Sequence, residues 1–263
     1  MGPPEYASYV YAVCRPFDAE AVDGLTGVGG HPVHVVAEAR LTAVVSTVPL
    51  HEFGEQALRN NLEDLRWLEE VARAHHGVVE AVGRRTVTVP LRLATVYHSD
   101  ERVREVLTEH GEAFDATLRE LAGRVELGVK VYAEAPAPPV PPARPSSGEA
   151  NPGRAYLRRR REQRDRRDDT WQRAVELCER TDEVLGGLAW AREQHRPQSA
   201  ALSEVSGENV MNNAYLVDEE RVGTFLATAH ELDSRAPKGV RIEVSGPWTP
   251  YSFATGRPSE VST

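Results

Sequence analysis

The chain has 263 residues and a mass of 29.0 kDa, with 31 Lys and Arg against 40 Asp and Glu, so its formal net charge is -9. This length suits one large or two ordinary domains, and 40% hydrophobic with 27% charged residues argues against a disordered or fibrous chain. No stretch approaches the roughly 20 consecutive apolar residues that span a bilayer, and the first residues lack the features of a signal peptide. We therefore expect a cytoplasmic protein, and the acidic charge argues against a general nucleic-acid binder.

The first part of the chain shows strand patterns followed by a helical stripe. Residues 9–14 are apolar on both alternating faces, which predicts a central strand, and residues 33–37 and 41–48 are β-branched runs that can pair as a hairpin. A helix is expected from about Glu55. Its apolar stripe recurs at three- and four-residue steps: Leu58, Leu62, Leu65, Leu68, Ala72 and His75.

Residues 86–97 predict one half-buried strand with alternating apolar positions. Pro90 cannot donate to a strand ladder, so this strand should lie at an edge or contain a bulge. Ser99 and Asp100 can cap a second helix, and a cleanly alternating strand follows at 125–131.

A proline-rich stretch divides the chain in two. Residues 135–153 hold seven of the 18 prolines among Ala, Ser and Gly, and such a run forms neither a helix nor a ladder. We therefore expect an N-terminal α+β domain at 1–134, a linker at 135–153 and a C-terminal α+β domain at 154–263.

The C-terminal half predicts the order helix, strand, strand, helix, strand. A long helix is expected at 154–192, a hairpin from 200–206 and 209–217, a helix after Asp218 and a last strand near 240–244. This is the ferredoxin-like order βαββαβ with its first strand absent or unrecognised. Both halves thus predict mainly antiparallel sheets with helices on one face.

An arginine-rich run lies at the start of the expected long helix. Residues 154–169 contain eight Arg and four acidic residues, a local charge of +4. Pairs at helical spacing, such as Arg161 with Asp165, favour a solvated and internally paired helix. An acidic protein partner and nucleic acid are the alternatives.

The sequence predicts no catalytic, cofactor or metal site. Cys14 and Cys178 are too few for a disulfide framework and are expected to be buried free thiols. The glycine-rich loop at 24–30 lacks the GxGxxG spacing and indicates a flexible connection, while His75 and His76 have no further ligands nearby. Because no nucleophile with an assignable base is visible, we expect a protein that is not an enzyme.

The C-terminal segment places three aromatic residues among prolines, in the order Gly246-Pro247-Trp248-Thr249-Pro250-Tyr251-Ser252-Phe253. It resembles the Gly-Pro-Trp-Pro-Pro-Tyr-Ser-Phe ending of the gas vesicle protein family GvpL/GvpF. Weaker matches to the same family follow in order along the chain: Tyr9-Val-Tyr-Ala-Val, Trp67 with His76, Val89-Pro90-Leu91-Arg92 with Thr95, Glu126-Leu-Gly128-Val129-Lys130-Val131, Gly153 to Leu157, and Asn213-Ala-Tyr215-Leu216-Val217. The chain departs from the family at Leu93-Ala94, where members often have Phe-Gly, and at Thr249, where the ending has Pro.

The resemblance implies two linked ferredoxin-like or modified α/β domains and a minor structural or accessory role in gas vesicle assembly. It implies the gas vesicle as location, and as partners the small hydrophobic shell protein and other accessory vesicle proteins, with no nucleic acid and no lipid membrane. A contrasting hypothesis is a small-molecule-binding or catalytic ferredoxin-like protein that uses the Arg92 strand and a cleft between the halves.

Five residues are candidate site residues. Trp67 lies off the helix stripe and Arg92 faces away from the apolar side of its strand, so both are candidates for a partner interface. Trp248, Tyr251 and Phe253 can each bury about 150–250 Å², so we expect the tail to be docked and to hold the two halves together.

Overall fold

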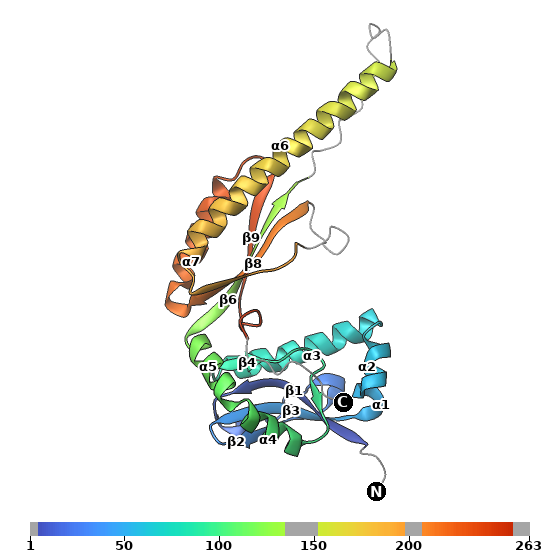
Figure 1. The fold of residues 1–263 in the computed structure, drawn as a ribbon, viewed down its shortest axis with the longest axis vertical. Coiled ribbons are helices and arrows are strands. Elements are labelled where there is room, and N and C mark those ends of the chain that lie inside the picture. The colour runs from blue at the N-terminus through green and yellow to red at the C-terminus, as the bar shows by residue number, and fades with distance from the viewer. Residues whose placement is uncertain (1–4, 135–151, 198–206, 255–263) are drawn as a thin grey trace. The chain divides into compact units, whose positions relative to one another are not determined.

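The computed structural model describes residues 5–134, 152–197 and 207–254, and the chain forms two compact units (Figure 1). Unit 1 contains Met1–Glu126 and Trp248–Thr263, and unit 2 contains Leu127–Pro247. This division differs from the expected boundaries, because the strand at 127–133 belongs to unit 2 and the C-terminal segment belongs to unit 1. The expected linker falls within the span of unit 2, and its residues 135–151 lie outside the described residues.

Unit 1 is built on a five-stranded sheet in the order β2-β3-β1-β4, with β5 also paired to β1. The pairings of β1 with β3, β4 and β5, and of β2 with β3, are antiparallel. Its elements are β1 (Tyr6–Cys14), β2 (Val33–Glu38), β3 (Leu41–Pro49), α1 (Leu50–Phe53), α2 (Glu55–Asn61), α3 (Leu65–Gly83), β4 (Thr88–Pro90), β5 (Val96–Tyr97), α4 (Asp100–Glu109) and α5 (Gly111–Leu121). The predicted central strand and the predicted hairpin are both confirmed.

Helices cover both faces of the unit 1 sheet (Figure 1). Because side chains alternate along a strand, Tyr9 and Tyr11 of β1 point to one face, where they join a core with α3. A bulge between Val10 and Ala12 shifts this alternation, and Val10 and Val13 are both buried outside that core. Helix α4 contacts the strands from the opposite face. The expectation that the helices gather on one face is therefore wrong for unit 1.

Two predicted elements of unit 1 are interrupted. The helix expected from Glu55 breaks after Asn61, because the Asp64 side chain caps a new helix by accepting the backbone N–H groups of Arg66 and Trp67 at 2.9 and 3.4 Å. The strand expected at 86–97 divides into β4 and β5, which the loop at 91–95 separates.

Unit 2 is built on a four-stranded sheet in the order β7-β8-β6-β9. Its elements are β6 (Arg124–Ala133), α6 (Pro152–Gly186), β7 (Ala191–Gln194), β8 (Glu208–Asp218), α7 (Val222–Ser234) and β9 (Val240–Trp248). The strand order expected for the C-terminal half lacked its first strand. Strand β6 takes that place, although we expected it in the N-terminal domain. The strand expected at 200–206 lies outside the described residues, and β8 pairs with β7, antiparallel.

The helices of unit 2 share one core on one face of its sheet. Leu127, Val129 and Val131 alternate along β6 and pack with α6 and α7 through Leu177 and Phe225. Helix α6 has 35 residues and is about 52 Å long at ~1.5 Å per residue.

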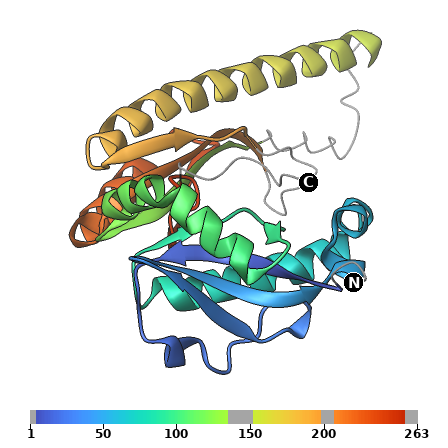
Figure 2. The same cartoon turned by 60° about the horizontal axis from the view of Figure 1, so that its bottom comes forward.

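Only the C-terminal half of α6 is buried in this core. Figures 1 and 2 show its N-terminal half running past the end of the sheet, and every side chain described between residues 157 and 169 is exposed. Glu162 pairs with Arg158 and Arg166 at 3.9 and 4.0 Å. The expected pair of Arg161 with Asp165 does not form in the described part of the chain.

Both cysteines are free, Cys14 buried and Cys178 half-buried. Within residues 5–134, 152–197 and 207–254, no helix combines the length and apolar character needed to cross a membrane.

Candidate functional site

His75 lies at the centre of an aromatic cluster in unit 1. It extends from the buried face of α3, with 3% of its surface exposed, and its Nδ1 lies 2.9 Å from the Tyr9 hydroxyl. Burial lowers the pKa of His75 to about 4, with the neighbouring His76 acting in the same direction. The imidazole is therefore neutral at pH 7, and its Nδ1 can accept a hydrogen bond from the Tyr9 hydroxyl.

A stack of rings extends from Tyr9 to the start of α3. The Tyr9 ring lies 5.8 Å from Phe53 in an edge arrangement, and Phe53 lies 5.7 Å from Trp67. The Trp67 indole N–H donates to the Glu52 carboxylate at 3.4 Å. Trp67, a predicted interface residue, is thus half-buried against the core rather than a free surface aromatic.

The glycine-rich loop at 24–30 forms one wall of the cluster. The Val28 N–H donates to the Tyr11 hydroxyl at 2.9 Å, and Val28 itself is buried. A Cβ at Gly27 would come within 1.9 Å of the Tyr11 hydroxyl oxygen, so only glycine fits there. The loop is packed against the core, and its expected role as a flexible connection is wrong.

The loop at 91–95 exposes Arg92. Thr95 donates to the Arg92 carbonyl through its hydroxyl at 2.8 Å and its N–H at 3.2 Å, which closes a tight turn. The Ala94 N–H donates to the Tyr9 hydroxyl at 3.0 Å and so fixes the loop to the cluster. The Arg92 side chain is exposed and makes no ion pair with another described residue.

Ala94 adopts a left-handed backbone conformation, with φ of 63°. This conformation costs a residue with a Cβ about 1–2 kcal/mol. Substitution by glycine removes this cost, but glycine also loses more conformational entropy on folding, which offsets part of the stabilisation. We expect Ala94→Gly to raise the free energy of unfolding by about 0.5 kcal/mol, measured by urea denaturation. Ala113→Gly, in the exposed part of α5, is the matched control and should lower it by about 1 kcal/mol. An equal loss at both positions would contradict the interpretation.

The C-terminal segment docks on α3 of unit 1. The Tyr251 ring lies 6.4 Å from His75 and 5.9 Å from His76, while Trp248 lies 6.0 Å from His76. Thr249 packs on Gly83, where an added Cβ would lie 2.8 Å from the threonine hydroxyl oxygen.

Glu126 fixes the end of this segment. Its carboxylate accepts the Ser252 backbone N–H and the Ser252 hydroxyl, both at 2.8 Å. Phe253 and Ala254 follow and are buried, with 9% and 2% of their surfaces exposed. The three predicted tail residues therefore differ, because Phe253 is buried and Tyr251 half-buried while Trp248 remains 44% exposed.

The structure brings together segments that are far apart in sequence. Tyr9, His75, Gly83 and Glu126 hold the site but were not among the predicted site residues. Tyr9 and Glu126 lay in two of the short matches that carried the family resemblance, yet neither periodicity nor spacing showed that these segments meet. The roles of Trp67 and Arg92 at a partner interface remain predictions.

The chemistry of the site is that of a packed cluster with an exposed rim. The Tyr9 hydroxyl and the His75 Nδ1 are engaged with one another, and burial raises the pKa of Tyr9 above its usual value. Within the described ranges, no group of three or more His, Cys, Asp or Glu is placed to hold a metal ion. Leu62 and Leu65 are exposed and precede Trp67 in the chain, and Leu65 is 78% exposed; we call these two residues the rim.

Comparisons with known proteins agree with these features. A family model described as gas vesicle synthesis protein GvpL/GvpF matches residues 7–255. The chain is 47% identical over 248 residues to gas vesicle protein L of a Streptomyces species, a match that covers 94% of this chain and 92% of the relative.

Solved structures show the same fold. The crystal structure of gas vesicle protein GvpF from an Anabaena species matches with a TM-score of 0.66, at 18% identity and 98% coverage of both chains. GvpF from Microcystis aeruginosa matches with a TM-score of 0.63, at 19% identity, covering 94% of this chain and 98% of that one. The chain belongs to the gas vesicle synthesis protein GvpL/GvpF family.

Proposed function

We propose that this chain is an accessory or minor structural protein of gas vesicle assembly, which acts from the cytoplasm and binds the small hydrophobic shell protein and other vesicle proteins. Membership of the family supports the assembly role. One observation supports binding through unit 1: segments that carry the family resemblance meet around His75, beside an exposed rim. A buried frame with an exposed edge suits a binding surface better than a reaction centre.

The proposed binding surface combines apolar and cationic side chains. Leu62 and Leu65 are exposed where α2 ends and α3 begins, and an apolar partner would gain by covering them. Arg92 extends from the loop that Tyr9 anchors and can pair with an acidic or backbone oxygen atom of the partner.

We propose that the chain is not itself an enzyme and that it needs no cofactor. Support comes from the character of the cluster, in which the His75 imidazole is neutral, buried and already bound to Tyr9. A general base must reach a substrate proton, and this imidazole is enclosed by rings.

We also propose that both units are variants of the ferredoxin-like fold. In each sheet the order of strands, numbered within the unit, is second, third, first, fourth. Unit 2 has the element order βαββαβ of that fold. Unit 1 has short 3-10 turns at Ala19–Val22 and Val28–Gly30 where the first helix of that order would stand.

We expect Arg92→Ala to weaken capture of the shell protein by the full chain several-fold, because the substitution removes an exposed charge at the proposed surface. The melting temperature should change by no more than about 2 °C, since the side chain supports nothing in the core. Binding is measured by affinity capture of purified shell protein.

Arg73→Ala is the control, because Arg73 is also an exposed arginine of unit 1 but lies on α3 and pairs with Glu69. Equal binding by both variants and the wild type would remove Arg92 from the surface. Deletion of the gene tests the function itself, and normal vesicles in its absence together with no capture would contradict the proposal.

A further inference from the structure

Helix α6 presents a stripe of exposed residues that begins on its projecting half and extends into its C-terminal half. Its members share one side of the helix, at steps of four, three, four, three and four residues: Leu157, Arg161, Arg164, Asp168, Trp171 and Val175. Such spacing places all six on one line of an α-helix. Leu157 is 66% exposed and Trp171 39%, which is unusual for apolar residues on a helix otherwise this polar.

The charges on this half of the helix divide into two groups. Off the stripe, Arg158 and Arg166 share the carboxylate of Glu162, and Arg167 pairs with Glu208 of β8 at 3.0 Å. On the stripe, Arg161, Arg164 and Asp168 make no ion pair with any other described residue. A stripe that keeps free charges of both signs suits a partner that also has both signs, and it disfavours a polyanion such as nucleic acid.

The order of the steps is the same from either end of the stripe. Two copies of α6 laid antiparallel would therefore place the stripe of one copy along the reversed stripe of the other. Leu157 of one copy would face Val175 of the other, Arg161 would face Trp171, and Arg164 would face Asp168. Each contact pairs apolar with apolar, cation with aromatic ring, or cation with carboxylate.

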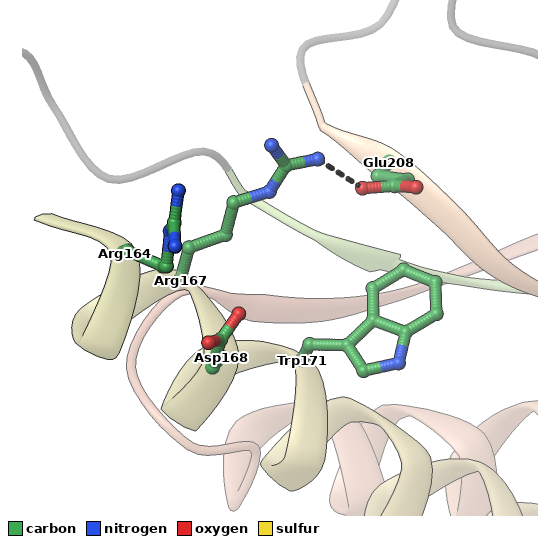
Figure 3. A pocket seen from close by; sticks show the side chains of 5 residues that line it. All are labelled: Arg164, Arg167, Asp168, Trp171 and Glu208. Atoms are coloured by element: carbon green, nitrogen blue, oxygen red, sulfur yellow. Dashed lines mark hydrogen bonds and ion pairs between the residues drawn. The ribbon is translucent and has the colours of Figure 1, made fainter.

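A pocket beside Trp171 fits the central contact. It has a volume of about 350 Å³ and is lined by Arg164, Arg167, Asp168, Trp171 and Glu208 (Figure 3). Because Arg167 already engages Glu208, the Asp168 carboxylate and the indole of Trp171 are available to an incoming guanidinium.

We propose that the exposed stripe of α6 is a self-association surface, on which a second copy of this chain binds antiparallel through its six residues. Each residue pair occurs twice about a two-fold axis, as in an isologous interface. The seam is about 27 Å long, which places it among small interfaces. This inference does not depend on the proposed binding of the shell protein.

The test is the mass of the full-length protein in solution, by light scattering and sedimentation from about 1 to 300 µM. The wild type should approach twice the 29.0 kDa of one chain as its concentration rises, and less so at high salt. Arg164→Asp alone and Asp168→Arg alone each bring like charges together, so each should raise the dissociation constant more than tenfold.

Combining the two substitutions separates this arrangement from any other. The double variant R164D/D168R should dimerise like the wild type, and a mixture of the two single variants should dimerise although neither does alone. Arg166→Asp, on the other side of the helix, is the matched control and should dimerise normally. A wild type that stays monomeric at 300 µM, dimers insensitive to R164D, or a mixture that stays monomeric would each overturn the proposal.

Discussion

We expect Phe253→Ala to lower the free energy of unfolding of unit 1 by about 3 kcal/mol, the usual cost of removing a buried phenylalanine ring. Phe253 is buried at the end of the docked segment, next to Ser252, whose backbone and hydroxyl are held by Glu126. Loss of the ring leaves a cavity and weakens the contacts of Tyr251 with α3. Hydrogen exchange of the full chain, followed by mass spectrometry, measures the effect on each unit separately.

Trp248→Ala is the matched control within the same segment. Its ring is 44% exposed and contacts His76, so the free energy of unfolding should fall by about 1 kcal/mol or less. Peptides from β1 and α3 should exchange faster in the Phe253 variant, while peptides from α7 and β8 keep their rates. Unchanged exchange in unit 1 would mean that the tail is a free arm rather than part of that unit.

We expect His75 to make the stability of unit 1 pH-dependent. Its pKa is lowered by burial to about 4 from an ordinary value of 6.5, so below pH 6.5 the unfolded chain binds a proton that the folded chain excludes. The free energy of unfolding is therefore not reduced by this proton above pH 6.5, and it decreases as the pH falls from 6.5 to about 4. The loss amounts to about 3 kcal/mol, from ~1.4 kcal/mol per pKa unit.

At each pH, the difference in the free energy of unfolding between wild type and His75→Gln isolates the contribution of His75 from that of the carboxylates. The variant should be less stable at pH 7, since it loses the ring contacts with Tyr9 and Tyr11, but its stability should fall less steeply between pH 6.5 and 4. Parallel curves for wild type and His75→Gln would show that the buried imidazole is not the titrating group.

The sequence predicted individual elements better than their assignment to units. The apolar run at 9–14 indicated a central strand, and β1 lies between β3 and β4. The alternating strand at 125–131 was also correctly recognised, but it was placed in the first half because the proline-rich stretch follows it. Which sheet a strand joins depends on its hydrogen-bond partners, and the partners of β6 are β8 and β9, far along the chain.

Only part of the candidate site could be predicted, because the rest of it also depends on partners that are far apart in the sequence. Aromatic residues among prolines pointed to a docked tail, and the tail is docked. Its receptor could not be inferred, because Tyr9 and His75 are 66 residues apart and Glu126 and Ser252 are 126 residues apart. Local patterns carry no information on such pairs, so they left Trp67 as either a second contact face or a surface aromatic, and it packs against Phe53.

Unit 2 is inserted within unit 1, between Glu126 and Trp248. During synthesis, therefore, unit 2 is finished while unit 1 still lacks the segment that covers His75. At about 5–20 residues per second, the ribosome needs roughly 6 to 25 seconds to pass from Glu126 to that segment. Until then, α3 of the nascent chain keeps an uncovered apolar face. A chain cut short by early termination or by a protease would keep this face permanently, and it would be a ready substrate for chaperones and degradation.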